Sequence, residues 1–177
     1  MAADEINPLT DAERRQCLWM IDELQVLSET GVFNDGFGSN PIYKASVTYA
    51  VILLNDLLQK MRKDGHRYRK PPTLDQPLAF EDVTHLIKDF RNTLCHIDSS
   101  FVIDDGEAQI SWSFAGPSPP GSFASIAGRV IPRVPEGDVS VGYGNISIAW
   151  NGDFVAAEAA VRKWLWEAMP DEFGVPI

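Results

Sequence analysis

The longest apolar stretch of the helical part is Tyr49-Ala50-Val51-Ile52-Leu53-Leu54, which Leu57, Leu58 and Met61 continue. A helix drawn through it is apolar on nearly every side, which is typical of a helix buried in a core. Asn40 and Pro41 supply a cap and a first position for this helix, and Asp64-Gly65 ends it. We therefore expect residues 41–63 to form the central helix of a bundle.

Three more helices are predicted around it, over residues of about 10–29, 81–96 and 153–169. The first begins with a capping box, in which Thr10 and Glu13 satisfy each other's free backbone amides. The other two repeat apolar residues at intervals of three and four, which indicates one buried face on each. Asn151 or Asp153 can cap the last helix. The sequence thus predicts a four-helix bundle.

The segment from about residue 100 to 150 differs from the helices. Apolar and polar residues alternate there in short runs, separated by glycine, proline and serine, as in strands and turns. We expect a hairpin that joins residues 101–103 to residues 110–114 through Asp105-Gly106. Roughly three to five strands would form a small antiparallel sheet. The predicted class is mainly α with a β insertion between helices three and four, in a single domain over residues 1–177.

Composition limits the possible functions. With 177 residues and 45% hydrophobic content, the chain can bury one core but is short for two domains. No apolar run reaches the roughly 20 residues that span a bilayer, and the start lacks a signal sequence, so we expect a cytoplasmic protein without a membrane segment. Cys17 and Cys95 are too few for a disulfide framework or a four-ligand zinc site. We predict neither a metal nor a cofactor.

A basic cluster stands out against the net charge of −10, which by itself argues against broad attraction to nucleic acid. Between residues 60 and 70, six basic residues outnumber the single acid Asp64, a local charge of +5. Cations at a helix end and in a solvated loop would explain the cluster structurally. Contact with an RNA backbone is the other interpretation, because this loop leads to the third helix. The candidate RNA-binding residues are Arg62, Lys63, Arg67, Arg69 and Lys70.

The end of the third helix carries the candidate catalytic residues, in the stretch Phe90-Arg91-Asn92-Thr93-Leu94-Cys95-His96. On an ideal helix Asn92 and His96 are neighbours, four residues apart, whereas Arg91 and His96 point about 140° apart. Arg91 and His96 therefore converge only if the helix unwinds near Cys95, or if a second copy of the chain brings its own pair.

The stretch from Arg91 to His96 resembles the Arg-polar-x-x-x-His motif of the HEPN superfamily, whose members include many metal-independent ribonucleases. The resemblance rests on this motif, on its place at the end of an amphipathic helix, and on the two helices before it. It implies a HEPN-like bundle that forms a homodimer, acts on RNA and serves as a toxin or antiphage effector with a cognate antitoxin protein. The β segment of roughly 50 residues departs from the simplest HEPN pattern.

Residues Arg91, Asn92 and His96 suit RNA cleavage without metal. Histidine titrates near neutral pH and can move the proton of a ribose 2′-hydroxyl or of a leaving 5′-oxygen. Arginine matches a phosphate and can stabilise the charge of five-coordinate phosphorus. Asn92 can orient the imidazole or bind a phosphate oxygen. The resemblance implies the same transesterification, which leaves a 2′,3′-cyclic phosphate.

Other interpretations stay open. Arg91 can bond helix-end carbonyls or an acid while His96 caps the helix, and the chain is then a non-catalytic HEPN-like module that binds a nucleotide, an RNA or a protein. A structural or adaptor domain whose sheet docks a partner is a third reading. A weak metal site is a further alternative, because one helical face carries His85, Asp89, Asn92 and His96.

Overall fold

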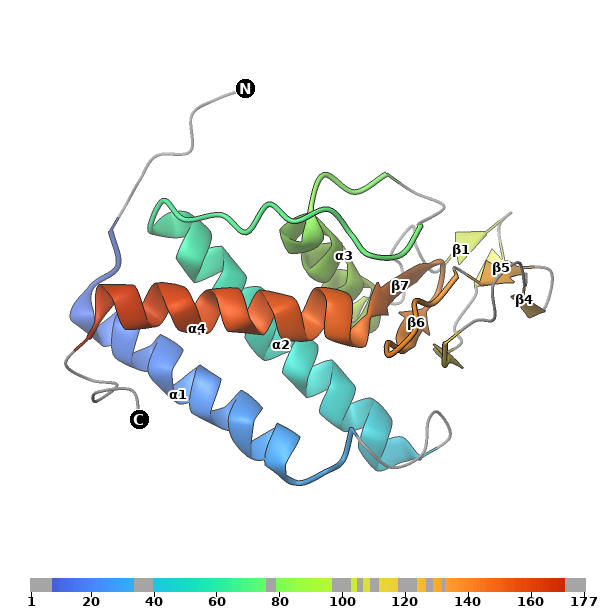
Figure 1. Ribbon diagram of the computed structural model, residues 1–177, viewed down its shortest axis with the longest axis horizontal. Helices are drawn as coiled ribbons and strands as arrows, with labels where there is room; N and C mark the ends of the chain where they lie inside the picture. Colours follow the sequence, from blue (N-terminus) through green and yellow to red (C-terminus); the bar gives the residue numbers. More distant parts are fainter. Residues whose placement is uncertain are drawn as a thin grey trace.

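The computed structural model describes residues 8–33, 40–75, 79–96, 103–104, 107–108, 112–117, 124–126, 129–131 and 133–170. In these segments, helices form a bundle and a small antiparallel sheet lies at one end of it (Figure 1). The α-helices are α1 (Asp11–Glu29), α2 (Pro41–Lys63), α3 (Val83–Cys95) and α4 (Ala156–Ala168). The predicted class, mainly helical with an antiparallel β insertion between helices three and four, is confirmed at this level.

Helix α2 is central, as its apolar sequence predicts. It contacts each of the other three α-helices, and buried side chains occur along nearly its whole length. Its start is capped by the Asn40 side chain, which accepts the backbone N–H of Ile42 at 2.9 Å. Gly65, with a φ of 86°, follows its end. None of the described helices is long and apolar enough to cross a membrane.

The sheet contains β3 (Trp112–Ala115), β6 (Ser140–Tyr143) and β7 (Ile146–Ala149), in the order β3-β6-β7 with antiparallel pairing. Phe114 lies opposite Val141, and Val141 opposite Ile148, so these three side chains share one face. Val141 and Ile148 are fully buried, and both of their strands contact α3. The sheet is thereby fixed against the helix that carries the candidate catalytic residues.

The predicted first hairpin is confirmed in part. The structure pairs β1 (Ile103–Asp104) with β2 (Glu107–Ala108) on either side of residues 105–106, and the outer parts of the predicted arms lie largely outside the described residues. It also pairs β3 with the distant β6, a partner that the sequence did not indicate. Through the pairing with β6, β3 adds Phe114 to a face that packs against the core. A second short pair joins β4 (Ala124–Ile126) to β5 (Arg129–Ile131).

The start of the fourth helix also differs from the prediction. A π-helical turn, η1 (Trp150–Val155), precedes α4, and its N-cap residue is Ala149, which makes no side-chain cap bond. Neither Asn151 nor Asp153 caps the helix in the usual way. Instead, Asp138 from the preceding turn accepts the backbone N–H groups of Asn151 and Gly152, both at 2.8 Å. A distant carboxylate thus replaces the local cap.

Candidate functional site

Helix α3 is held firmly at its start. The Asp82 side chain accepts the backbone N–H of His85 at 2.9 Å, which caps the helix. Oδ2 of Asp82 also lies 2.7 Å from Nε of Arg67. Nη2 of the same arginine lies 2.9 Å from Oε2 of Glu81. Val83, Leu86, Ile87 and Phe90 have no exposed surface. Because its apolar face is buried and its start is anchored, α3 presents its last turn in one orientation.

Helix α3 ends near Cys95, the place where unwinding would allow Arg91 and His96 to converge. The helix stops at Cys95, and His96 adopts an extended backbone with φ −131° and ψ 108°. The His96 N–H still donates to the carbonyl oxygen of Asn92 at 2.9 Å. The angle of about 140° between Arg91 and His96 applies only while both residues are helical, so it no longer holds here.

Arg91 and Asn92 touch each other, and His96 is exposed. The Nη1 of Arg91 donates to Oδ1 of Asn92 at 3.4 Å, a long and weak hydrogen bond. The Nε of Arg91 is buried and has no hydrogen-bond partner among the described residues. In this part of the chain Arg91 and His96 form neither a hydrogen bond nor an ion pair with each other. The structure thus joins two of the three predicted residues and leaves His96 separate.

The face of α3 that carries Asn92 also carries an imidazole–carboxylate pair. His85 Nε2 lies 3.1 Å from Oδ2 of Asp89, one turn further along the helix. Asp89 is the more buried partner, with a side chain 16% exposed. No group of three or more metal-ligating side chains occurs among the described residues. The face can offer hydrogen bonds to a polar ligand.

The candidate RNA-binding residues are divided among contacts within the chain. Lys63 Nζ lies 2.8 Å from Glu13, and Arg67 is paired with Asp82 and Glu81. Lys70 Nζ donates to the Thr73 hydroxyl and to the Gly152 carbonyl, each at 2.7 Å. Arg62 is half-buried and also has a contact within the chain. Arg69 is exposed, and it is the candidate best placed to meet a ligand.

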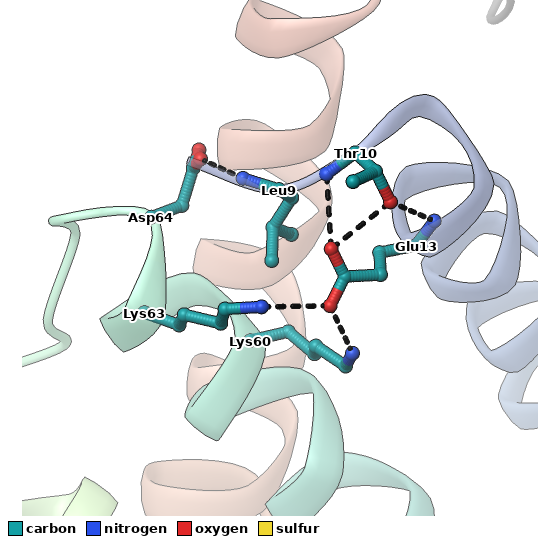
Figure 2. A network of polar contacts seen from close by, with 6 residues as sticks. All are labelled: Leu9, Thr10, Glu13, Lys60, Lys63 and Asp64. Atoms are coloured by element: carbon teal, nitrogen blue, oxygen red, sulfur yellow. Dashed lines mark hydrogen bonds and ion pairs between the residues drawn. The ribbon is translucent and has the colours of Figure 1, made fainter. Parts of the chain in front are cut away.

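Figure 2 shows the network that engages Lys63, which we call the first junction. Thr10 and Glu13 form the predicted capping box, and Glu13 Oε1 also accepts from Lys60 and Lys63 at 2.9 and 2.8 Å. Hydrogen bonds from Lys63, the Thr10 backbone and Lys60 hold the pKa of Glu13 well below its usual range. Asp64 accepts the backbone N–H of Leu9 and, through its other oxygen, Nε1 of Trp164. The network joins the start of α1, the end of α2 and α4.

The sequence did not indicate a second network, which we call the loop junction. It contains Lys70, Thr73, Asp138, Gly152 and Asp153. Asp153 has no exposed surface, accepts the backbone N–H of Thr73 at 2.8 Å and that of Ala149 at 3.0 Å, and lies 3.5 Å from Nζ of Lys70. Lys70, the residue of the basic cluster nearest to α3 in sequence, is therefore occupied in holding the loop against η1. The sequence offers only acids near a helix start as a signal, and this pattern suggests local capping.

Comparison with known proteins adds no assignment to this geometry. The chain matches no protein family model, no curated protein and no solved structure.

Proposed function

We propose that this chain is a metal-independent endoribonuclease of HEPN type, in which Arg91, Asn92 and His96 act on an RNA phosphodiester. The observation that carries the proposal is the end of α3. The helix stops at Cys95 and His96 has an extended backbone, so the angle of about 140° that an ideal helix sets between Arg91 and His96 does not apply. The end of the helix at this point supports the proposal, because convergence of Arg91 and His96 within one chain requires the helix to unwind near Cys95.

The proposed reaction is a transesterification. The ribose 2′-oxygen attacks phosphorus, its proton passes to the His96 imidazole, and the bond from phosphorus to the 5′-oxygen breaks. The leaving oxygen takes a proton from His96 of a second protomer in the proposed homodimer. The products are a 2′,3′-cyclic phosphate and a 5′-hydroxyl, so protons balance and no water is consumed.

Arg91 supplies charge to the phosphate in this scheme. Its Nε is buried while Nη1 reaches Asn92, so the side chain has little freedom and the guanidinium is presented in a narrow range of positions. The 3.4 Å bond to Asn92 is weak enough to be exchanged for a phosphate oxygen. Asn92 then becomes available to bind the same phosphate or to orient an imidazole.

The biological role that we propose rests only on the resemblance to HEPN proteins. A cytoplasmic toxin or antiphage effector, paired with a cognate antitoxin protein, is the role that the HEPN-like motif favours. The other basic candidates of the segment 60–70 are half-buried and have contacts within the chain. Arg69 is exposed and is therefore the first residue to examine for RNA contact.

The test is cleavage of a mixed RNA pool in the presence of EDTA. We expect the unmodified protein to produce 2′,3′-cyclic phosphate ends, and His96→Ala and Arg91→Ala to reduce cleavage at least about a hundredfold, the range of one lost acid–base or charge-stabilising group. His66→Ala and Arg133→Ala are matched controls, because both residues are exposed and lie outside α3. Cleavage that persists in the α3 variants would reject the proposal.

A non-catalytic RNA-binding module is the second candidate, and the lack of a bond between Arg91 and His96 favours it. In that case the same RNA pool would be bound but not cut. Arg69→Gln would weaken binding and lower its salt dependence, since each lost phosphate contact removes about one released counterion. His96→Ala would leave binding unchanged. The two candidates therefore differ in the response to His96→Ala.

A further inference from the structure

Exposed apolar side chains gather on the outer side of α1 and α2. Six large apolar residues are exposed in the described chain, and four belong to these two helices: Trp19 (54% exposed), Val26 (58%), Ile42 (68%) and Tyr49 (37%). We call this surface the α1–α2 face. Contiguous exposed apolar patches mark sites of association, whereas single scattered residues do not.

Helix periodicity places each pair on one side of its helix. Trp19 and Val26 are seven residues apart on α1, and Ile42 and Tyr49 are seven apart on α2. Seven residues make almost two whole turns, so the two members of each pair project in nearly the same direction. Each helix therefore presents an apolar stripe to solvent in addition to the one it buries.

The two stripes are neighbours because α1 and α2 lie side by side and antiparallel. Glu13 near the start of α1 bonds Lys60 near the end of α2, and Figure 1 shows the two helices running alongside each other. Between these ends, Glu23 of α1 meets Tyr49 of α2. Partial burial of the Tyr49 hydroxyl raises its pKa, and the nearby Glu23 carboxylate raises it further. The two stripes thus lie on adjacent helices.

A pocket of about 420 Å³ adjoins this face where α1 ends and α2 begins. Leu27, Val32, Ile42 and Tyr43 contribute apolar lining, and Asn40 and Ser46 contribute polar atoms. The volume lies within the range of sites that bind small organic groups, roughly 300–1,000 Å³, and is ample for one large side chain. Ile42 belongs to both the face and the pocket, so one ligand can occupy both.

Acidic residues surround the apolar stripes. Asp22 and Glu29 are exposed beside the α1 stripe, and Asp56 continues the α2 stripe one heptad after Tyr49. Arg15, also exposed, is the basic residue one turn before Trp19. A second copy of this chain, which carries a net charge of −10, would bring further acids against these. A partner with apolar anchors and basic flanks meets the same surface with complementary charge.

We propose that the α1–α2 face docks a basic amphipathic helix of a partner protein, with its apolar stripe between α1 and α2 and one large side chain in the adjoining pocket. Helix-in-groove recognition uses anchors at intervals of three, four and seven residues, which is the spacing that the two stripes offer. This inference is independent of the ribonuclease proposal, because the face contains no residue of the α3 motif.

The test measures binding of a fluorescently labelled synthetic peptide by anisotropy. The peptide has about 18 residues, enough to form a helix on contact, with leucines at three- and four-residue intervals and lysines elsewhere. A scrambled peptide of the same composition is the control for charge alone. We expect the helical peptide to bind more tightly than the scrambled one, and added salt to weaken its binding.

Protein variants assign the binding to this face. Trp19→Ala combined with Ile42→Ala should weaken binding at least about tenfold, since large buried anchors dominate such interfaces. Trp166→Ala is the matched control, an exposed tryptophan on α4 that should leave affinity unchanged. Asp22→Asn with Asp56→Asn should weaken binding and flatten its salt dependence, whereas Glu136→Gln, exposed near the sheet, should do neither.

Three results would overturn the proposal. The scrambled peptide binding as well as the helical one would show charge attraction without a groove. Equal affinities of the Trp19→Ala, Ile42→Ala variant and the Trp166→Ala variant would place the site elsewhere. Sedimentation that finds a dimer for the unmodified chain and a monomer for Trp19→Ala, Ile42→Ala would assign the face to a second copy. Unchanged circular dichroism melting of each variant excludes unfolding as the cause.

Discussion

The first junction and the loop junction both tie helix ends together with carboxylates, but they are built differently. In the first junction the central acid, Glu13, has a side chain that is 23% exposed, and it bonds both Thr10, three residues away, and Lys60, 47 residues away. In the loop junction Asp153 is fully buried, and its partners Thr73 and Lys70 are about 80 residues away. The comparison separates a partly exposed junction, in which a local capping box also takes part in long-range contacts, from a buried one whose acid mainly fixes how distant segments meet.

The largest effect is expected at Asp153. Replacing it with Ala leaves the buried backbone N–H groups of Thr73 and Ala149 without an acceptor and removes the charge beside Lys70. We expect the free energy of unfolding to fall by about 3 kcal/mol, as when one partner of a buried polar network is lost. Urea unfolding followed by circular dichroism measures it.

Glu167→Gln is the matched control for Asp153→Ala. It removes an ion pair with Lys163 on α4, the helix that follows η1, which spans 3.9 Å between two mostly exposed side chains. Such a pair contributes at most about 0.5 kcal/mol. Equal losses for the two variants would mean that burial does not distinguish the loop junction.

The sequence predicts contacts between residues that are near each other in the chain better than contacts between distant residues. The capping box of α1 and the cap of α2 depend on residues two or three apart, and both form as expected. The pairing of β3 with β6 joins residues that are 25 to 31 positions apart, and local alternation does not indicate it. The cap of the fourth helix comes from Asp138, about 13 residues upstream, and no local pattern indicates it.

The candidate site shows both sides of this limit. The amphipathic pattern placed Arg91, Asn92 and His96 at the end of the third helix, and α3 ends at Cys95. Whether Arg91 and His96 act together depends on a substrate or a second protomer, and stays a prediction. In the sequence, the basic cluster could be recognised only by its charge. Its ion pairs to Glu13 and Asp82 depend on where α1 and α3 come to lie, which local sequence does not specify.

A smaller effect is expected from Gly152→Ala in the loop junction. A Cβ at this position would lie 2.5 Å from the Thr73 hydroxyl oxygen and 2.9 Å from an Asp138 oxygen, both of which are held in hydrogen bonds. Overpacking of this kind costs about 1–3 kcal/mol of unfolding free energy. Urea unfolding of the single variant measures it.

The background of Thr73→Ala supplies the control for Gly152→Ala. It removes the Thr73 hydroxyl and methyl groups that the new Cβ would meet. Gly152→Ala should therefore cost less in that background than in the unmodified chain, and the difference is the coupling energy of a double-mutant cycle. Equal costs in the two backgrounds would show that Thr73 does not restrict position 152.

The smallest and most conditional effect belongs to Glu13 in the first junction, because it depends on pH. Bonds from Lys63, the Thr10 backbone and Lys60 lower the pKa of Glu13 in the folded chain below its ordinary value of 4.5. A carboxylate with a depressed folded pKa stabilises the fold fully above its unfolded pKa, and this stabilisation is lost as the pH falls below that value. The stability difference between the unmodified chain and Glu13→Gln should therefore be constant from about pH 6 to pH 5 and shrink toward pH 3.

Removing the two lysines decides whether this pH dependence comes from the first junction. In a Lys60→Met, Lys63→Met background, two of the three leading causes of the lowered pKa are absent. The change in stability difference between about pH 5 and pH 3 should then become smaller, because the Thr10 bonds alone remain to favour the charged form. An undiminished change would assign the effect to the capping box, so that α1 would hold Glu13 without help from α2. A reduced change would show that even this local motif owes part of its strength to a helix about 47 residues away.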